Sequence, residues 1–191
     1  LVKGPTVTPG YFNNPEANAA AFTGDGYFRT GDAGYFTPSG ALVLTERVKD
    51  LFKTSNGKYI SPQALETKLA IDRYIDQIAV IADERKFVSA LIVPVYGFVK
   101  DYAKEKGIAY SNMDELLQHP KIQALFRARI DTLQQQFAHY EQVKRFTLLT
   151  EPFSMERGEL TNTLKLKRSV VAKNYKGLIL SLIHISEPTR P

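Results

Sequence analysis

The stretch of residues 26–60 limits the possible fold most, because it alternates short apolar segments with turns that contain glycine. Thr37-Pro38-Ser39-Gly40 has proline second and glycine fourth, the positions that a type I turn favours. We therefore expect a hairpin that joins residues 34–36 to residues 41–44. Ser55-Asn56-Gly57-Lys58 is another glycine turn. The sequence thus predicts short strands here, with charged groups at the joints between them.

The rest of the chain combines helical patterns with apolar strands. Residues 77–82 and 89–95 are rich in β-branched side chains and flank the charged segment 83–86, so we expect two antiparallel strands. Residues 121–140 show the clearest helical pattern, since six apolar side chains recur every three or four positions. These side chains are Ile122, Phe126, Ile130, Leu133, Phe137 and Tyr140. A helix on a mostly antiparallel sheet predicts an α+β domain.

Capping residues predict two further helices. Asn14 precedes Pro15 and Ser61 precedes Pro62, and a capping side chain ahead of a first-turn proline is typical of a helix start. The buried stripe of the second helix is expected at Leu65, Leu69 and the region around Ile75. The first of these helices is expected over residues 15–22, and the other predicted elements are helices over residues 98–106 and 114–118 and a strand over residues 146–149.

Composition sets bounds without naming a function. The 191 residues suffice for one good core, or one domain plus part of another. The absence of cysteine excludes disulfides and thiolate metal sites. No apolar run is long enough to span a bilayer, and no secretory signal opens the sequence. A net charge of +5 favours an anionic partner, whether nucleotide, CoA, lipid headgroup or nucleic acid.

Four motifs in one order carry a resemblance to a known family. GYFNNPE at residues 10–16 is followed by GYFRTGD at 26–32, RVKDL at 47–51 and GELTNTLKLKR at 158–168. In this order the motifs resemble the adenylate-forming acyl-CoA synthetases, and most closely the long-chain fatty acid–CoA ligases. The resemblance covers roughly residues 1–179.

The resemblance implies a fold and a domain plan. Residues 1–48 correspond to the β-rich C-terminal end of a large adenylation domain, and residues 49–179 to a small mobile C-terminal domain. Because the sequence begins inside a domain, we interpret it as a fragment. Residues 180–191 have no place in the family pattern and resemble a translated sequencing adapter, so we interpret them as a non-native tail.

Adenylation joins a carboxylate to the α-phosphate of ATP, so the site has to hold the ribose and screen two reacting anions. One carboxylate can accept both ribose hydroxyls, and the resemblance gives Asp32 that task. It also implies ATP contacts for Thr30 and Arg47. Without the other motifs, an aspartate that caps a turn is the simpler interpretation of Asp32. For Arg47 the alternative is a surface arginine paired with Glu46 or Asp50.

A lysine is expected to stabilise the charge that builds up during adenylation. Leu164 and Leu166 alternate with Lys165 and Lys167, so on an extended segment both lysines leave on one side. Spacing does not say which lysine points inward, and the resemblance selects Lys165 as the catalytic one. The other lysines of this region are interpreted as a solvated basic surface: Lys167, Lys173 and Lys176.

The resemblance also implies a hinge and a second half-reaction. Lys49 falls where the family pivots, and a few backbone torsions can absorb such a rotation. After rotation, Lys53, Gly57 and Lys58 are expected to approach the CoA pantetheine and the acyl-adenylate.

The cofactors and partners follow from the same resemblance. ATP and coenzyme A are the expected co-substrates, and a fatty acid is the acyl donor. Mg²⁺ is expected to have its ligands upstream of Leu1, as are the phosphate loop and the acyl tunnel, so no metal site is predicted here. We therefore expect the fragment alone to be inactive. A cytoplasmic location is expected, with peripheral contact to the inner face of the membrane because the substrate is a lipid.

Two alternatives remain open. Within the superfamily, an acyl-acyl carrier protein synthetase or a peptide-synthetase adenylation module has the same motif types. From another class, a basic module for nucleic acid or an anionic membrane fits the charge of +5. Against nucleic acid, no segment combines clustered Lys and Arg with a stacking platform, so none is predicted as a partner.

Overall fold

The computed structural model describes residues 1–184, apart from the side chains of Glu46, Lys49, Ile183 and His184. The chain divides after Asp50 into two compact units, here called unit 1 and unit 2, and each is described by itself. The predicted non-native tail, 180–191, lies outside the described residues from residue 185 onward.

Unit 1 is built from one helix, one hairpin and one helical turn. Its elements are α1 (Pro15–Ala21), β1 (Asp32–Phe36), β2 (Leu42–Arg47) and the 3-10 turn η1 (Val48–Asp50). The Asn14 side chain caps α1 by accepting a hydrogen bond from the Ala17 N–H at 3.0 Å, as predicted. β1 and β2 pair antiparallel, so the predicted hairpin is confirmed.

The hairpin depends on two glycines. Gly40 has a φ of +82° and donates to the Thr37 carbonyl at 2.9 Å, which closes the predicted turn. At Gly34 the pairing register shifts, and a Cβ there would lie 2.5 Å from the Val43 carbonyl oxygen. This close backbone approach therefore requires glycine.

Unit 1 has no buried core among its described side chains. Large apolar groups are exposed instead, including Phe12 at 93%, Phe36 at 73% and Leu44 at 64%. The hairpin is thus held by backbone hydrogen bonds and turn chemistry rather than by burial of its apolar side chains.

Unit 2 contains the described core of the chain. In chain order its elements are β3 (Phe52–Lys53), β4 (Tyr59–Ile60), α2 (Pro62–Leu69), β5 (Ile75–Ile81), β6 (Val88–Pro94), α3 (Tyr96–Glu105), α4 (Met113–Gln118), α5 (Pro120–Leu133), β7 (Val143–Leu148), α6 (Arg168–Asn174) and α7 (Lys176–His184). Ser61 caps α2 by accepting from the Ala64 N–H at 3.2 Å. The predicted helix starts and the two apolar strands are confirmed.

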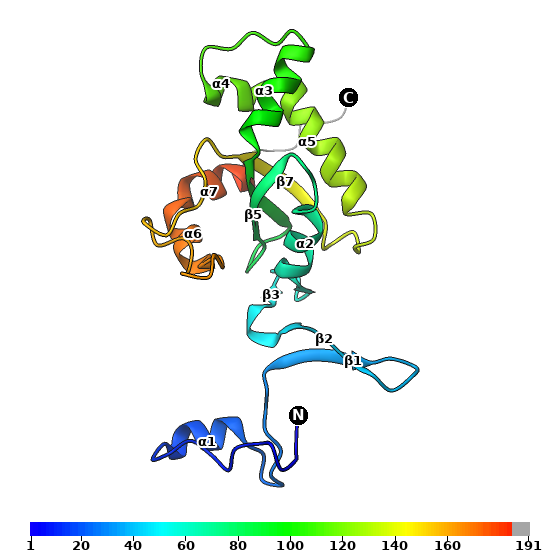
Figure 1. Cartoon of the computed structure of the whole chain (residues 1–191), viewed down its shortest axis with the longest axis vertical. Helices are drawn as coiled ribbons and strands as arrows, with labels where there is room; N and C mark the ends of the chain where they lie inside the picture. Colours follow the sequence, from blue (N-terminus) through cyan, green and yellow to red (C-terminus); the bar gives the residue numbers. More distant parts are fainter. Residues whose placement is uncertain (185–191) are drawn as a thin grey trace. The chain divides into compact units, whose positions relative to one another are not determined.

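The sheet of unit 2 has the order β5-β6-β7 (Figure 1). β5 runs antiparallel to β6, as predicted, whereas β7 runs parallel to it. A parallel neighbour needs a crossover, and α3, α4 and α5 supply it between β6 and β7. The α+β class is confirmed.

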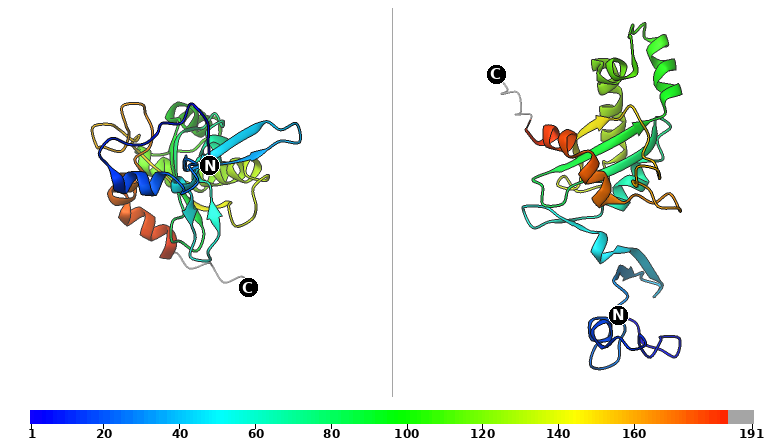
Figure 2. Two further views of the ribbon diagram at one scale, coloured as in Figure 1. Left: turned by 90° about the horizontal axis from the view of Figure 1, so that it is seen from below. Right: turned by 90° about the vertical axis from the view of Figure 1, so that its left-hand side faces the viewer.

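Helices cover both faces of this sheet (Figures 1 and 2). Val80 and Ile92 face the core that includes α2 and α5, whereas Ala79 and Leu91 face the core that includes α6 and α7. β6 is consequently buried along its whole length, which explains why its sequence is apolar except for Ser89. No helix within residues 1–184 has the length and apolar character needed to cross a membrane.

Two sequence predictions about helix limits are wrong. α5 ends at Leu133, so Phe137 and Tyr140 lie outside it. The cause is Gln134, which is 3% exposed and whose amide oxygen accepts from the Val143 N–H at 2.8 Å. Ile75 does not belong to the stripe of α2, because it begins β5.

Tyr96 links the crossover to the sheet through its hydroxyl group. The raised pKa of this hydroxyl predicts that the protein loses stability in alkali. The Tyr96 hydroxyl donates to the Leu149 carbonyl at 3.1 Å, and burial, followed by the nearby Asp76 and Glu151 carboxylates, raises its pKa to about 12. An unfolded tyrosine has a pKa of about 10. The folded state therefore holds the proton more tightly, and the stabilisation present below pH 10 is lost as the pH rises towards 12.

Denaturant unfolding between pH 9 and 12 checks this prediction. Tyr96→Phe is expected to flatten the fall in the free energy of unfolding relative to wild type, and Tyr110→Phe, at an exposed site, to leave it unchanged. An identical slope in wild type and Tyr96→Phe would contradict the assignment.

Candidate functional site

The structure brings the three predicted ATP residues of unit 1 together. Asp32 begins β1 and Arg47 ends β2, and the two are paired in the hairpin register. Arg47 Nε lies 3.4 Å from Asp32 Oδ1. The Asp32 N–H donates to Thr30 Oγ1 at 3.1 Å. Arg47 thus pairs with a residue that the sequence interpretation, which weighed Glu46 and Asp50, did not consider.

These residues line one hollow of unit 1 with a volume of about 830 Å³. Its other walls come from Tyr11, α1 and the segment that leads to β1. Asp32 is 27% exposed and Arg47 70%, so both remain accessible to a ligand. A carboxylate beside a guanidinium can accept hydroxyl hydrogens and donate to phosphate or ribose oxygens at the same time.

The candidate catalytic lysine of unit 2 lies in a closed turn. The Thr161 N–H donates to the Lys165 carbonyl at 2.8 Å, and the Lys165 N–H donates to Thr161 Oγ1 at 3.0 Å. Leu164 has a φ of +59°, which is uncommon for a residue other than glycine. Lys165 itself is exposed. The turn therefore holds its backbone and leaves its side chain accessible.

The predicted extended segment around Lys165 is short: Leu166 forms an isolated antiparallel bridge with Leu160. Leu164 is in the left-handed region, and Lys167 is already the residue before α6. The extended stretch between the turn and α6 is therefore no longer than residues 165–167. The hydrogen bonds between Thr161 and Lys165 close the turn. The alternation of apolar and basic residues in the sequence does not predict these hydrogen bonds.

Glu159 anchors the N-terminal end of this loop. It is 1% exposed and accepts from Arg157 Nε at 3.1 and 3.2 Å, from Asn174 Nδ2 at 3.0 Å and from the Ser154 N–H at 3.0 Å. Burial acts to raise the pKa of the Glu159 carboxyl, but these hydrogen bonds outweigh it and hold the pKa below its ordinary value. Its carbonyl also accepts from the Lys167 N–H at 2.8 Å.

Arg168 anchors the other end. Its guanidinium binds both carboxylate oxygens of Glu66 on α2, at 2.5 and 2.6 Å, and lies over the Phe52 ring at 5.6 Å. Glu66 in turn accepts from the Val80 N–H of β5 at 2.8 Å. The loop that carries Lys165 is therefore tied to a helix and to the central sheet.

A second hollow, of about 540 Å³, lies beside this anchored loop. The loop contributes Lys165 and its two leucine neighbours, α2 contributes Glu66, and the start of β5 contributes Gln77. The lysine thus borders a concave surface of mixed polar and apolar character.

The predicted residues of the second half-reaction form a separate turn. Lys53 ends β3, and Gly57 has a φ of +75° in the loop to β4. Lys53 Nζ lies 6.0 Å from the Tyr59 ring centroid, and Lys58 Nζ lies 5.7 Å from that of Tyr140. They are not among the side chains that line the hollow beside Lys165. The predicted hinge residue Lys49 is within η1, and its side chain lies outside the described structure.

Sequence reasoning missed three residues that hold the lysine loop: Glu66, Glu159 and Arg168. The family motif contains the last two without stating a role, and Glu66 is one of several charged residues on α2. Only the fold shows that Glu66 binds Arg168 and that Glu159 accepts from Asn174. In the described part of the chain no cluster of three or more Asp, Glu or His side chains fits a metal ion, so we derive no step through Mg²⁺.

The sequence is similar to curated long-chain acyl-CoA synthetases. It is 35% identical over 170 residues to the peroxisomal long-chain acyl-CoA synthetase 7 of Arabidopsis thaliana. The aligned region covers 87% of this chain and 24% of the relative. It is 34% identical over 176 residues to a long-chain-fatty-acid–CoA ligase of Mycobacterium tuberculosis, which covers 92% of this chain and 29% of the relative. No protein-family model matches the sequence.

Solved structures agree with these relatives. The adenylation domain of a carboxylate reductase from Mycobacterium chelonae superposes with a TM-score of 0.73 at 27% identity, over 94% of this chain and 26% of that one. The adenylation–carrier didomain of a carboxylic acid reductase from Segniliparus rugosus, in complex with AMP, gives a TM-score of 0.67 at 26% identity, over 95% of this chain and 24% of that one. The chain therefore belongs to the adenylate-forming family of acyl-CoA synthetases and spans about a quarter of the length of the relatives it matches.

Proposed function

We propose that this chain is part of an ATP-dependent long-chain fatty acid–CoA ligase. In the proposed reaction, a fatty acid and ATP form an acyl-adenylate and diphosphate, and CoA then takes the acyl group and releases AMP. The observation that carries the proposal is Lys165, an accessible lysine on a loop anchored at both ends beside a hollow, in a chain 35% identical to a long-chain acyl-CoA synthetase.

In the first step, unit 1 holds the nucleotide. The Asp32 carboxylate has lone pairs free beyond its contact with Arg47, and these accept the ribose hydroxyls. Arg47 donates to the ribose or the α-phosphate. A fatty-acid carboxylate oxygen then attacks the α-phosphorus, the bond to the bridging oxygen breaks, and diphosphate leaves with the electron pair.

Lys165 offsets the negative charge that collects on the α-phosphate and the attacking carboxylate. A compact ammonium held on a fixed backbone stabilises this charge with little reorganisation. The anchors at Glu159 and Arg168 support this role because they limit how far the loop can relax. Lys165 is accordingly the proposed catalytic residue.

In the second step, the CoA thiol attacks the acyl carbonyl and AMP leaves. We assign this step to the turn that contains Lys53, Gly57 and Lys58, with Lys49 as the pivot that exchanges the two faces of unit 2. The positive φ of Gly57 favours glycine at this position, and the absence of a side chain there leaves room for the thiol arm of CoA.

A chimera tests the proposal. Residues 1–179 replace the matching segment of the Mycobacterium tuberculosis ligase, and AMP and acyl-CoA are measured with palmitate, ATP and CoA. We expect the folded chimera to form both products and the isolated chain to form neither. A chimera that unfolds cooperatively but forms no acyl-adenylate would overturn the proposal, as would ligase activity of the chain alone.

The same chimera separates the acceptors. Acyl-adenylate formation followed by transfer to an acyl carrier protein, but not to CoA, would favour a carrier-protein ligase. The likeness to an adenylation–carrier didomain makes this the second candidate.

A further inference from the structure

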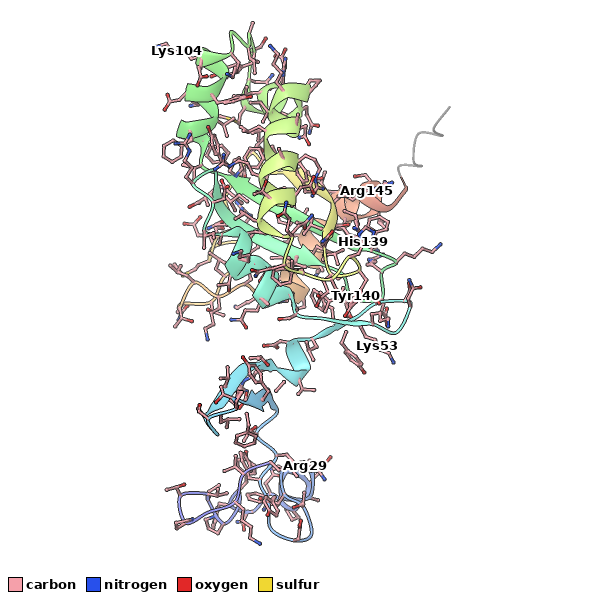
Figure 3. The ribbon with its side chains drawn as sticks, turned by 90° about the vertical axis from the view of Figure 1, so that its right-hand side faces the viewer. Arg29, Lys53, Lys104, His139, Tyr140 and Arg145 are labelled. Carbon is pink, nitrogen blue, oxygen red and sulfur yellow. The ribbon has the colours of Figure 1, made fainter. Side chains whose placement is uncertain are left out.

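One face of unit 2 gathers cations from segments that are far apart in the sequence. We call it the basic face; its members are Lys53, Lys58, Arg85, Lys86, Lys144 and Arg145. They come from the β3–β4 hairpin, from the β5–β6 turn and from β7 with the loop before it. Figure 3 labels Lys53, Tyr140, His139 and Arg145 along one side of this unit. No single stretch of sequence contains the cluster.

Direct contacts join these segments in a closed circuit. The Ser55 N–H donates to the Arg85 carbonyl at 3.0 Å, which sets the hairpin against the β5–β6 turn. Arg145 lies over the Phe87 ring at 5.3 Å, which sets that turn against β7, and its guanidinium also donates to the Leu182 carbonyl of α7 at 2.9 Å. Lys144 Nζ lies 3.1 Å from His139 Nδ1.

The circuit closes at Tyr140, the neighbour of His139. The Lys58 ammonium lies over the Tyr140 ring, 5.7 Å from its centroid, and Lys58 belongs to the β3–β4 hairpin. These contacts place the β3–β4 hairpin, the β5–β6 turn and β7 side by side, and Lys58 and Lys144 reach the neighbouring side chains of Tyr140 and His139.

Most of the positive charge on this face is accessible. Lys53, Lys58 and Lys86 are exposed, and Lys144 and Arg145 are half-buried. Three carboxylates lie on the same loops: Asp83, Glu84 and Glu141. Asp83 accepts a hydrogen bond from the Lys53 N–H at 3.4 Å, and Glu141 accepts one from the Ala138 N–H at 2.9 Å. Two of the three carboxylates therefore already bind backbone N–H groups. The six cations leave a net charge of about +3 for a partner.

The two tyrosines on this face distinguish between anionic partners. Tyr59 and Tyr140 are 59% and 46% exposed, and each has a lysine ammonium over its ring. A stacked nucleobase needs a free ring face, which these lysines partly occupy. A half-exposed tyrosine beside a lysine instead suits a lipid headgroup region, where the ring meets the interface and the ammonium stays hydrated.

We propose that the basic face docks unit 2 onto an anionic lipid surface. Each cation close to such a surface contributes about 1 kcal/mol, or roughly fivefold in affinity. Several cations on one face therefore give reversible attachment without a membrane-spanning helix. This inference goes beyond the proposed ligase function, although the basic face shares Lys53 and Lys58 with the turn assigned there to the CoA step.

Vesicle sedimentation tests the proposal with the 191-residue chain. We expect the chain to bind vesicles of equal parts phosphatidylcholine and phosphatidylglycerol, and not vesicles of phosphatidylcholine alone. Binding is expected to weaken as salt rises, because the Debye length shortens from about 30 Å at 0.01 M to about 10 Å at 0.1 M. The triple variant Lys58→Gln, Lys86→Gln and Lys144→Gln is expected to bind roughly 100-fold more weakly.

A matched control removes the same charge elsewhere on unit 2. Lys100→Gln, Lys104→Gln and Lys121→Gln change exposed lysines of α3 and α5, outside the basic face, and are expected to bind like wild type. Lys86→Glu provides a single-site variant in case the triple variant fails to fold, and circular dichroism checks both. Equal loss in the control would overturn the proposal, because net charge alone would then explain binding.

Competition experiments identify the source of the anion. A single-stranded oligonucleotide that binds more tightly than the anionic vesicles would overturn the proposal in favour of nucleic acid. Release of the vesicles by stoichiometric CoA would assign the basic face to the nucleotide instead. Retention of the vesicles under both conditions supports lipid docking.

Discussion

Replacing Lys165 with alanine is expected to slow acyl-adenylate formation by about 100- to 1,000-fold, the usual effect of removing one preorganised electrostatic group from a reacting centre. The loss is expected in kcat rather than in the KM for ATP, because the ammonium acts on charge that builds up during the reaction. Transfer of the acyl group from synthetic acyl-adenylate to CoA is expected to continue, since that step uses the other turn of unit 2.

Diphosphate release by the chimera measures the first step, and CoA consumption with supplied acyl-adenylate measures the second. Lys167→Ala, two residues along the same loop, is the matched control and is expected to leave both rates within about twofold of the parent. Asp32→Ala is expected to raise the KM for ATP instead, because it removes a ground-state contact. An equal loss of rate in Lys165→Ala and Lys167→Ala would contradict the assignment of Lys165.

Glu159→Ala is expected to lower the free energy of unfolding of unit 2 by about 3 kcal/mol, because it leaves Arg157, Asn174 and the Ser154 N–H without their shared acceptor. Denaturant unfolding of the chain at pH 7 measures this effect. The pKa of Glu159 is held below its ordinary value, so its stabilisation is present at neutral pH and is lost as the pH falls below the unfolded pKa of about 4.3. The difference between the variant and wild type is therefore expected to shrink in acid.

The exposed neighbour Glu156 provides the control. Glu156→Ala changes the same charge in the same loop and is expected to shift the free energy of unfolding by no more than about 0.5 kcal/mol. Glu159→Gln, which keeps one acceptor oxygen, is expected to lie between Glu159→Ala and wild type. If Glu156→Ala were as destabilising as Glu159→Ala, the loop would respond to charge in general and not to the buried anchor.

The features that the sequence predicted well depend on local chemistry. Asn14 and Ser61 cap their helices through their own side chains, and Gly40 closes its turn through its own backbone. The hairpin that joins β1 and β2 follows from the same turn, although its pairing of Asp32 with Arg47 was not predicted. Such features need only neighbouring residues, so the order of residues encodes them directly.

The features that the sequence did not predict depend on partners that are distant in the chain. Gln134 ends α5 because its amide meets Val143 of β7, and no helical period contains this information. The parallel direction of β7 depends on the crossover that precedes it. The half-buried ion pair of Arg168 with Glu66 joins two helices through residues 102 positions apart. The basic face likewise exists only after three separate segments have packed together.

The two anchors of the lysine loop also set the scale of any motion that carries Lys165. A loose loop could swing within nanoseconds, but this one is fastened to a helix and to a β-strand through Arg168 and Glu66. Any displacement of Lys165 beyond the reach of its own side chain has to carry unit 2 along as a rigid body. Such travel belongs to the microsecond-to-millisecond range, so in the proposed ligase the approach of Lys165 to the reacting groups would be a motion of the whole unit rather than of one flexible arm.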